Sequence, residues 1–473
     1  EQFDNWTRPD KLKRLIMQAI NLREFLFSKI CKVVPVIESF TRQAESSLYI
    51  SVLHYLSMYP DNKEVANSFH HYLLILGLVN QMLVQQPQCF GFEQFQHYTS
   101  NGLREYSEQE YEQRFLQLAG NQLDNIKIIE GRFSPKDKEY KNNYLIDKIR
   151  RGWLLLNNRQ GCNKSDIRLI AHFIKRADKQ KKDIRFKELR LKNRKICEAL
   201  ISLRNSGSKN GKAIVGIDAA ASEFDTSPEV FAPVFKKLRE KGFQHFTYHA
   251  GEDFYHLLGG LRAIYEAITF LDLQRGDRIG HATAAGVAPE TWAHNVGCEV
   301  VVPIGAYMDD LLFVYYLISN NECKALDSLM PRLYMRITEL SREIYPNDDF
   351  QVYDLIYAWK RRQEDILELA DSDELNNIKA LRRYHQKEYV EKYKKEIKVN
   401  IFEILDEKAL REVQLAILKI MHHKEIAIET LPTSNIFIGY HNSFNTYHLV
   451  NWIRWEKEGK PIPPIVLGTD DAG

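Results

Sequence analysis

The first quarter of the chain carries hydrophobic residues at helical spacing. Leu12, Leu15, Ile16 and Ile20 form one such series, and Tyr72, Leu73, Ile75, Leu76 and Val79 form another. Apolar residues three or four positions apart share one face of an α-helix, which packs against a core. Strand-like alternation is rare in this part of the chain. We therefore expect residues 1–124 to form a helical N-terminal region that packs on the rest of the molecule.

The hydrophobic pattern changes near Asn125, where short β-rich runs begin to alternate with amphipathic helical stretches. This alternation is typical of repeated βα units and predicts a parallel sheet in an α/β fold. We expect strands at residues 126–132, 167–174, 213–218, 245–249, 278–281, 426–430 and 465–469. Ile214, Val215 and Ile217 make one run almost continuously apolar, as expected for a strand buried on both faces. Seven strands are one fewer than a closed (β/α)8 barrel of the TIM type requires.

A long interval separates the strand at 278–281 from the one at 426–430, and it exceeds any ordinary βα loop. We expect residues 287–423 to be a mostly helical insertion that makes oligomer or partner contacts and is strongly helical and charged from 336 to 412. Barrel strands then occupy 125–286 before the insertion and 424–473 after it. The charged stretch at 384–396 is interpreted as a solvated helix face, with a subunit contact as the alternative.

Composition narrows the classes of partner. The 473 residues are 44% apolar and 27% charged, and the net charge is only +2, so no global field favours nucleic acid or a membrane. Six scattered cysteines without a C-x-x-C pair argue against a disulfide framework and for a reducing, cytoplasmic location. We find no apolar run long enough to span a membrane. The basic stretch 175–195 is interpreted as a surface helix in preference to a phosphate or nucleic-acid patch.

The carboxyl ends of five expected strands are rich in His, Asp, Glu and Ser. They are 218–223, HAGE at 249–252, RIGH at 278–281, 429–435 and 468–471. In a (β/α) barrel the functional side chains come from these ends. Alone, HAGE could be a core histidine with a helix-start acid, and Asp470–Asp471 could be a turn. Five such ends together predict an active site.

These residue types suit metal-assisted hydrolysis. A Zn²⁺ held by neutral imidazoles and carboxylates lowers the pKa of a bound water from about 16 toward 7. We expect His249 and Asp470 to be ligands and His281 to position the attacking water. Glu252 is the expected proton shuttle. Two adjacent ionised carboxylates repel, so Asp471 is assigned to the substrate.

The ordered set HAGE, R-I-G-H, P-T-S-N at 432–435 and T-D-D at 469–471 resembles the adenosine and AMP deaminase family of zinc hydrolases. Further similarity comes from 129–135 and from 215–218. The resemblance covers about 126–286 and 424–473. It implies a Zn²⁺ site that includes His249 and Asp470. It also implies that Glu252 protonates purine N1, His281 orients the hydroxide that attacks C6, and Asp471 bonds the purine. Asp218 and Ala221, at the matching fourth-strand end, are the other expected substrate-binding residues.

The helical N-terminal region and the large insertion look most like the deaminase component of the bacterial RADAR anti-phage system. That resemblance implies a large shell-like homo-oligomer and an ATPase partner. It also implies conversion of adenine nucleotides or RNA adenosine to inosine forms. The substrate itself stays open among adenosine, AMP, ATP and RNA, because basic residues such as Lys136, Lys138 and Arg278 do not distinguish a phosphate site from surface charge.

Two departures from the family pattern stand out. The family's first strand carries two zinc ligands as H-x-H, a motif absent here, and we expect that strand to precede Glu1. The seven strands are therefore numbered two to eight. Ala221 stands where the family usually has a glycine whose N–H approaches purine N3, which predicts a shifted base or an altered substrate preference. A catalytically inactive scaffold and an amidohydrolase acting on another ring are the alternative functions.

Overall fold

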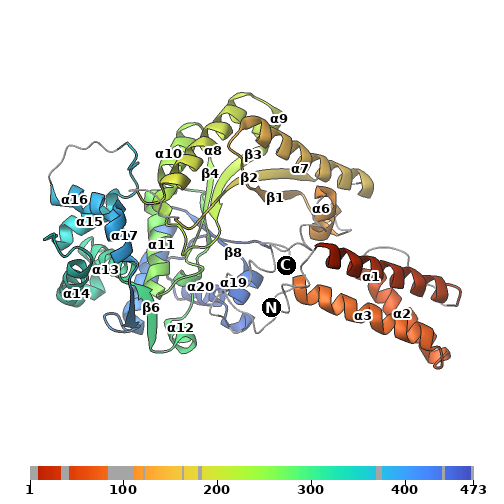
Figure 1. Cartoon of the computed structure of the whole chain (residues 1–473). Helices are drawn as coiled ribbons and strands as arrows, with labels where there is room; N and C mark the ends of the chain where they lie inside the picture. Colours follow the sequence, from red (N-terminus) through yellow and green to blue (C-terminus); the bar gives the residue numbers. More distant parts are fainter. Residues whose placement is uncertain are drawn as a thin grey trace. The chain divides into compact units, whose positions relative to one another are not determined.

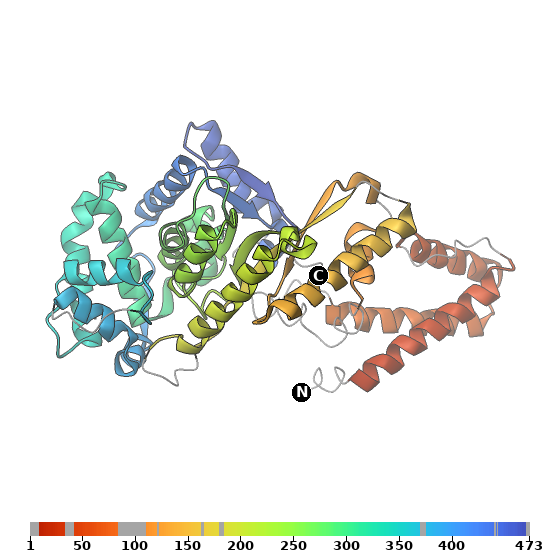
Figure 2. The same cartoon turned by 90° about the horizontal axis from the view of Figure 1, so that it is seen from above.

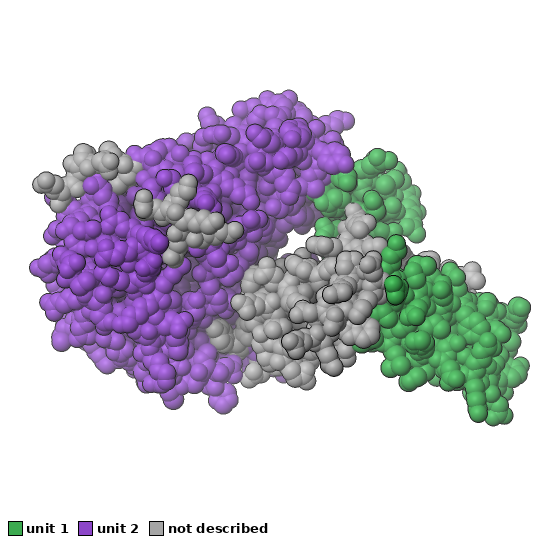
Figure 3. All heavy atoms as spheres, viewed as in Figure 1, with its two compact units in different colours: residues 1–127, 148–165, 471–473 green, residues 128–147, 166–470 purple. Residues whose placement is uncertain are grey.

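The chain forms two compact units in the computed structural model. Unit 1 comprises Glu1–Lys127, Lys148–Ser165 and Asp471–Gly473, and unit 2 comprises Ile128–Asp147 and Asp166–Asp470 (Figure 3). The structure describes residues 9–33, 42–83, 110–120, 123–161, 165–178, 184–368, 375–438, 441 and 443–469. Because the two units are separate bodies, each is described on its own.

Helices build the described part of unit 1, as the hydrophobic spacing predicts. Helices α1 (Pro9–Ile30), α2 (Arg42–Met58) and α3 (Lys63–Leu83) pack together (Figures 1 and 2). Their shared core contains Leu26, Ile30, Leu48, Val52 and Val65, all fully buried. The remaining elements are α6 (Tyr111–Ala119), the 3-10 turn η1 (Leu123–Asn125) and the second half of α7 (Glu139–Gln160).

A seven-stranded, all-parallel sheet forms the centre of unit 2. Its strands pair in the order β1-β2-β3-β4-β5-β8-β9. Their bounds are β1 Ile128–Phe133, β2 Asp166–Ile174, β3 Ile214–Ala220, β4 His245–Ala250, β5 Arg278–His281, β8 Ala427–Thr430 and β9 Ile465–Leu467. All seven coincide with the strands expected from sequence. The parallel α/β sheet is therefore confirmed. Within the described residues β9 does not pair with β1, and closure into a complete barrel stays a prediction.

The strand register brings the polar strand ends to one edge of this sheet. Ala250 lies opposite His281 in the β4–β5 pair, and Gly280 lies opposite Glu429 in the β5–β8 pair. Parallel strands share their direction, so side chains that follow β4, β5 and β8 meet at the same carboxyl edge.

Helices connect and cover the strands. Before β5 they are α8 (Lys187–Asn205), α9 (Lys209–Ala213), η2 (Pro228–Val230), α10 (Ala232–Glu240) and α11 (Leu257–Phe270). After β8 they are α19 (Pro432–Ile438), η5 (Phe444–Thr446) and α20 (His448–Lys457). Helix α11 packs against β4 and also against α13 and α18, which belong to the interval between β5 and β8.

That interval is mostly helical, and α13 to α17 form a group beside α11 (Figure 1). Its helices are η3 (Thr283–Ala285), α12 (Pro289–Val296), α13 (Ile304–Ser319), η4 (Lys324–Leu329), α14 (Met330–Ile344), α15 (Val352–Arg361), α16 (Asn376–His385), α17 (Lys387–Tyr393) and α18 (Glu407–His423). The stretch from 336 to 412 is strongly helical, as expected, in α14 to α17 and the start of α18, but one segment of it is a strand. Strand β7 (Glu396–Asn400) pairs antiparallel with β6 (Glu299–Pro303), where Val399 is buried.

Two charged stretches are more buried than their charge pattern predicts. In the stretch 384–396, Lys392 and Glu388 form the expected i,i+4 pair at 2.9 Å, yet Tyr384, Tyr389 and Val390 are buried. The surface-helix interpretation of 175–195 is wrong for three of its basic residues. Lys175, Arg185 and Arg190 are buried, because strand β2 and the start of α8 are covered by other elements of unit 2.

Candidate functional site at the strand ends

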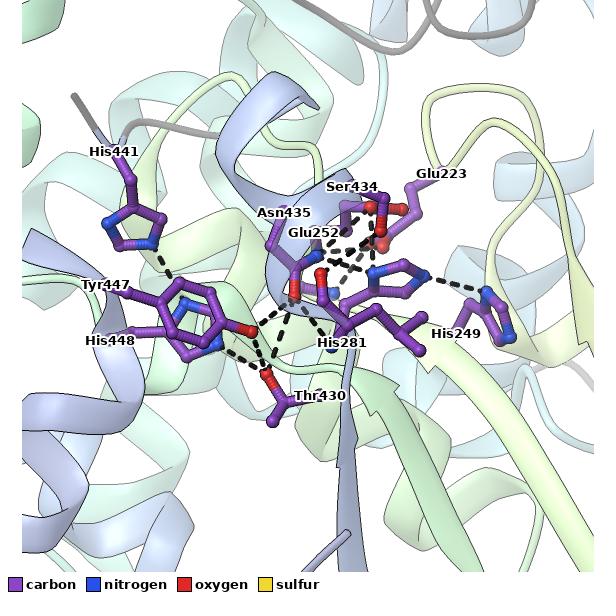
Figure 4. Close-up of polar contacts among 12 residues, drawn as sticks. Glu223, His249, Glu252, His281, Thr430, Ser434, Asn435, His441, Tyr447 and His448 are labelled. Atoms are coloured by element: carbon purple, nitrogen blue, oxygen red, sulfur yellow. Dashed lines mark hydrogen bonds and ion pairs between the residues drawn. The ribbon is translucent and has the colours of Figure 1, made fainter. Parts of the chain in front are cut away.

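Four side chains from the ends of β4, β5 and β8 lie in direct contact (Figure 4). His249 Nδ1 lies 3.1 Å from His281 Nε2, and His281 Nδ1 lies 2.8 Å from Glu252 Oε1. Asn435 Nδ2 lies 2.6 Å from His281 Nδ1 and 3.3 Å from Glu252 Oε1. We call His249, Glu252, His281 and Asn435 the strand-end cluster. The residues expected to carry catalysis and one expected metal ligand are thus brought together.

Local backbone features explain how these side chains converge. Gly251 has φ +77°, a conformation that favours glycine, and the turn directs Glu252 back toward the sheet edge. A carboxylate anchors this turn, because Glu223 accepts the N–H groups of Gly251 and Glu252 at 2.7 and 2.9 Å. A Cβ at Gly280 would lie 2.7 Å from His249 Cδ2, so the missing side chain makes room for that imidazole.

His281 occupies a strained backbone conformation. Its φ is +67°, in the left-handed region that a residue with a Cβ rarely adopts. Such a conformation costs on the order of 1–3 kcal/mol and persists where the surroundings hold it. Here both ring nitrogens are engaged, by His249 on one side and by Glu252 and Asn435 on the other. Strain of this kind gathers at functional sites.

A group of charged and polar side chains from β1, β2 and β3 contacts the strand-end cluster at His249. Asp218 is fully buried, and its Oδ2 accepts from Arg132 Nε at 2.7 Å and lies 2.9 Å from His172 Nδ1 and 3.3 Å from His249 Nε2. Burial alone would raise the pKa of Asp218, but its contact with His249, the charge of Arg132 and the contact with His172 bring that pKa well below its usual value. Asp218 is therefore ionised.

His249 is held in its neutral form. Burial lowers the pKa of its imidazole, and the nearby Asp218 only partly opposes that effect. Lys175 Nζ donates to the backbone oxygen of His249 at 2.7 Å and stacks on the Tyr248 ring. A neutral imidazole with a fixed ring is the form that ligates metals.

A second hydrogen-bonded chain extends from Asn435 away from β5. Tyr447 OH donates to Asn435 Oδ1 at 3.0 Å and contacts Thr430 Oγ1. His448 Nε2 lies 2.9 Å from Thr430 Oγ1, and its Nδ1 lies 2.9 Å from His441 Nε2 (Figure 4). Burial lowers the pKa of His441 to about 4, so this chain is uncharged. It fixes the orientation of the Asn435 amide.

The described atoms fit a metal ion only in part. His249 Nε2 and Asp218 Oδ1 are buried and have no hydrogen-bond partner. His249 Nε2 lies 3.3 Å from Asp218 Oδ2, and a neutral imidazole nitrogen beside an ionised carboxylate provides two suitable zinc donors. In the part of the chain that the structure describes, no group of three or more His, Cys, Asp or Glu residues could hold a metal. The predicted ligand Asp470 and the predicted substrate residue Asp471 lie outside the described residues.

The two other expected substrate-binding residues follow or belong to β3. Ala221 has φ +89°, so this alanine adopts the backbone conformation that a glycine would favour. Asp218 contacts Arg132, His172 and His249, and its assignment to the substrate stays a prediction.

Sequence reasoning missed His172, Lys175 and the positioning role of Asn435. A single polar residue inside the apolar run 169–173 was the available signal for His172.

Comparison with known proteins gives one sequence match and several structural ones. The chain is 26% identical over 227 residues to an adenosine deaminase of Clostridium kluyveri, a match covering 47% of this chain and 54% of that protein. The chain thus spans about half the length of the curated relative it matches. No family model matches the chain.

The structural matches are weak. The complex of ADAL with IMP aligns with TM-score 0.39 and 13% identity over 84% of this chain and 71% of that chain. A zinc-bound cog1816 amidohydrolase from Burkholderia ambifaria gives TM-score 0.23 and 15% identity over 45% and 46%. An adenine deaminase from Arthrobacter aurescens gives 0.23 and 17% over 56% and 61%. Among the described helices none has the length and apolar character to cross a bilayer.

Proposed function

We propose that the protein is a hydrolytic deaminase that acts on a 6-aminopurine and releases ammonia. The observation that carries the proposal is the continuous contact from Glu252 through His281 to His249 at neighbouring strand ends. This arrangement places a carboxyl group, a bridging imidazole and a buried neutral imidazole in one line. The similarity to an adenosine deaminase supports the same reaction class.

We propose Zn²⁺ as the cofactor, with His249 Nε2 and Asp470 among its ligands. The unpaired, buried Nε2 of His249 is the observation in favour of this assignment. When bound, zinc supplies a water whose pKa lies near 7 and so a nucleophile at neutral pH. Asp218, ionised and 3.3 Å from His249 Nε2, adds negative charge where the cation would lie.

The proposed roles of the chain's own residues follow from their contacts. Glu252 delivers a proton to purine N1, which makes C6 more electrophilic. His281, next to both Glu252 and His249, positions the attacking water, and the proton that this water loses is passed to the C6 amino group, which leaves as ammonia. Asp471 accepts a hydrogen bond from the purine, and Asp218 and the backbone N–H of Ala221 line the base. Asn435 contacts both Glu252 and His281 and so fixes the position of one side chain relative to the other.

Finer features of the function are proposals that rest on the RADAR-like resemblance. They are an adenine nucleotide such as ATP or an RNA adenosine as substrate, a shell-like homo-oligomer, an ATPase partner and a role in anti-phage defence. We propose that residues 287–423 supply the oligomer or partner contacts. Light scattering of the purified protein, alone and with its ATPase partner, tests the assembly.

The reaction is tested by combining a substrate panel with metal analysis. Adenosine, AMP, ATP, adenine and a short RNA are incubated with the purified protein, and ammonia and inosine products are quantified. Stoichiometric zinc together with ammonia release from at least one adenine compound is the expected result. Purified protein that binds no zinc and releases no ammonia from any of them contradicts the proposal.

The second candidate function is a deaminase-like scaffold without catalysis. The observation in its favour is that the sequence contains no H-x-H motif, which supplies two zinc ligands in the family that the chain resembles. The same panel separates the two candidates, because a scaffold assembles normally while releasing no ammonia.

A further inference from the structure

A group of buried basic side chains lies away from the strand-end cluster, where the segment before α8 meets the helices between β5 and β8. Arg185 precedes α8, Arg190 lies in its first turn, Arg362 follows α15 and His385 ends α16. We call these four residues the basic cluster. Their exposed fractions are 6%, 3%, 5% and 3%. Lysine, arginine and charged groups in general are rarely this buried without counter-charges.

The carboxylates near the basic cluster are already engaged. Both oxygens of Asp309 accept from Arg362, at 2.6 and 3.0 Å, and Tyr393 donates to the same group. Glu229 accepts from Tyr384 and lies 3.8 Å from Arg190. Burial also raises the pKa of Glu229, which weakens it as a counter-charge. The three guanidinium groups of the basic cluster therefore contact only two carboxylates, Asp309 and Glu229, among the described residues.

Arg185 is the arginine of the basic cluster that contacts neither of these carboxylates. Within the described residues it forms no hydrogen bond and no ion pair. Its guanidinium instead packs between two aromatic rings, 3.9 Å from the centre of Tyr384 and 4.2 Å from that of Tyr393. Aromatic faces attract the positive charge but leave the N–H groups in the plane without acceptors.

The basic cluster contains several buried nitrogen atoms without a hydrogen-bond partner. They are Nε and Nη2 of Arg185, Nε and Nη2 of Arg190, Nε of Arg362, and both ring nitrogens of His385. Buried polar atoms in folded proteins are almost always hydrogen-bonded, so this concentration points to a missing partner. Water alone would not balance the excess positive charge, whereas an anion would accept hydrogen bonds and neutralise it.

We propose that the basic cluster is a binding site for a phosphate group. A tetrahedral phosphate offers several acceptor oxygens, and arginine guanidinium groups recognise such oxygens in pairs. His385 contributes a neutral donor, because burial and the three neighbouring arginine charges hold its pKa well below the usual value. The phosphate comes from inorganic phosphate or from the phosphate of a nucleotide. The site is independent of the proposed deamination, since none of its residues belongs to the strand-end cluster.

Bound phosphate would join two parts of unit 2. Arg185 and Arg190 belong to the segment between β2 and β3, whereas Arg362 and His385 belong to the interval between β5 and β8. Contacts to both would raise the stability of unit 2 in proportion to occupancy.

Thermal unfolding of three proteins tests the site. They are the wild type, Arg185→Met and the matched control Arg275→Met, which removes an 85% exposed arginine paired with Glu425. Each is unfolded in phosphate and in chloride of equal ionic strength and pH. We expect phosphate to raise the Tm of the wild type and the control by roughly 2–5 °C relative to chloride. We expect no such rise in Arg185→Met.

The same experiment distinguishes the proposal from a purely structural role of Arg185. Without phosphate, Arg185→Met removes an uncompensated buried charge, so its Tm should equal or exceed that of the wild type. In phosphate the wild type should have the higher Tm of the two proteins. A variant that is less stable than the wild type by the same amount in both buffers overturns the proposal, as does a wild type that phosphate does not stabilise beyond chloride.

Titration calorimetry identifies the source of the phosphate and serves if Arg185→Met fails to fold. Inorganic phosphate, AMP and adenosine are titrated into the wild type and into Arg190→Gln. Binding of inorganic phosphate that weakens by about tenfold or more in the variant supports a free-ion site. An equal loss for AMP but not for adenosine supports a nucleotide phosphate. Unchanged affinities for both phosphate compounds in the variant contradict the site.

Discussion

Unit 2 contains two buried polar clusters that differ in how their charges are satisfied. In the strand-end cluster both ring nitrogens of His281 have partners, and His249 lacks only one, at Nε2. In the basic cluster both nitrogens of His385 and four of the nitrogens of Arg185 and Arg190 lack partners. Burial is similar in the two places. The number of buried atoms without a hydrogen-bond partner therefore matches the size of the proposed ligand, which is a single metal ion at the strand-end cluster and a polyatomic anion at the basic cluster.

In the strand-end cluster, the largest loss of activity is expected when Glu252 is changed to glutamine. The variant loses the carboxyl proton but keeps the size of the side chain, so we expect turnover to fall by about 10²–10⁴-fold with zinc content unchanged. Ammonia release and elemental analysis measure the two quantities. The matched control Glu425→Gln changes an exposed carboxylate paired with Arg275 and should behave as the wild type. Full activity of Glu252→Gln would show that this group transfers no proton.

A methyl group at position 280 tests whether the His249 ring must occupy its present place. In Gly280→Ala the new Cβ would lie 2.7 Å from His249 Cδ2, so the ring has to move. We expect activity to fall by about 10²-fold, since small misplacements of reacting groups have effects of that size. Gly131→Ala is the control, because its Cβ would meet Leu169 at an ordinary 3.7 Å. Equal activity of both variants would mean that the ring position is unimportant.

Asn435→Ala tests the positioning role of the amide. The variant removes contacts to His281 and Glu252 without removing either group, so we expect kcat to fall by about tenfold while KM changes little. Asn435→Asp, which retains the acceptor for Tyr447, should fold normally and shift the acidic limb of the pH–rate profile upward, because a carboxylate beside His281 favours its protonation. A structural role alone would leave that profile in place.

A further effect, on stability and not on turnover, is expected at His256, a buried histidine that has both nitrogens paired, in contrast to His385. His256 Nε2 contacts the backbone oxygen of Ile401, and its Nδ1 accepts from Leu258 N–H. Burial lowers its pKa to about 4, so the unfolded chain binds a proton first as the pH falls below about 6.5. The associated stability is present above pH 6.5 and is lost toward pH 4.

His256→Gln should therefore reduce the acid sensitivity of the protein. Between pH 7.5 and 5 the wild type should lose about 2 kcal/mol more of its free energy of unfolding than the variant. Urea unfolding at the two pH values gives this difference. Identical losses in both proteins would rule out titration of His256.

The strands and helices of this chain were predictable because their signal is local. Ile214, Val215 and Ile217 are apolar whatever surrounds them, and β3 lies where the run predicts it. The strand at 396–400 was missed because its sequence, Glu-Ile-Lys-Val-Asn, follows a charged helix directly and is defined by its pairing with β6. Pairing between segments distant in sequence is not readable from either segment alone.

The sites were predictable to different degrees. The motifs HAGE and RIGH predict His249, Glu252 and His281 as site residues, because these residue types stand at strand ends. The parallel register of β4 and β5 then brings the three side chains together. His172 gave a weaker signal, since a lone histidine in an apolar strand is more often a core residue. The burial of Arg185 was not predictable, because the rings that cover it, Tyr384 of α16 and Tyr393 of α17, lie far along the chain.

The pairing of β6 with β7 also bears on how this protein could have evolved. Pro303 and Glu396 are partners in that pair, so the chain leaves the α/β framework and returns to it at neighbouring points. Everything between these two residues, including α13 to α17, is attached through a pair of adjacent ends. A segment attached in this way can be exchanged, enlarged or shortened without altering the order of the seven parallel strands. The two-stranded pair β6–β7 marks the place where such an exchange would join the rest of unit 2.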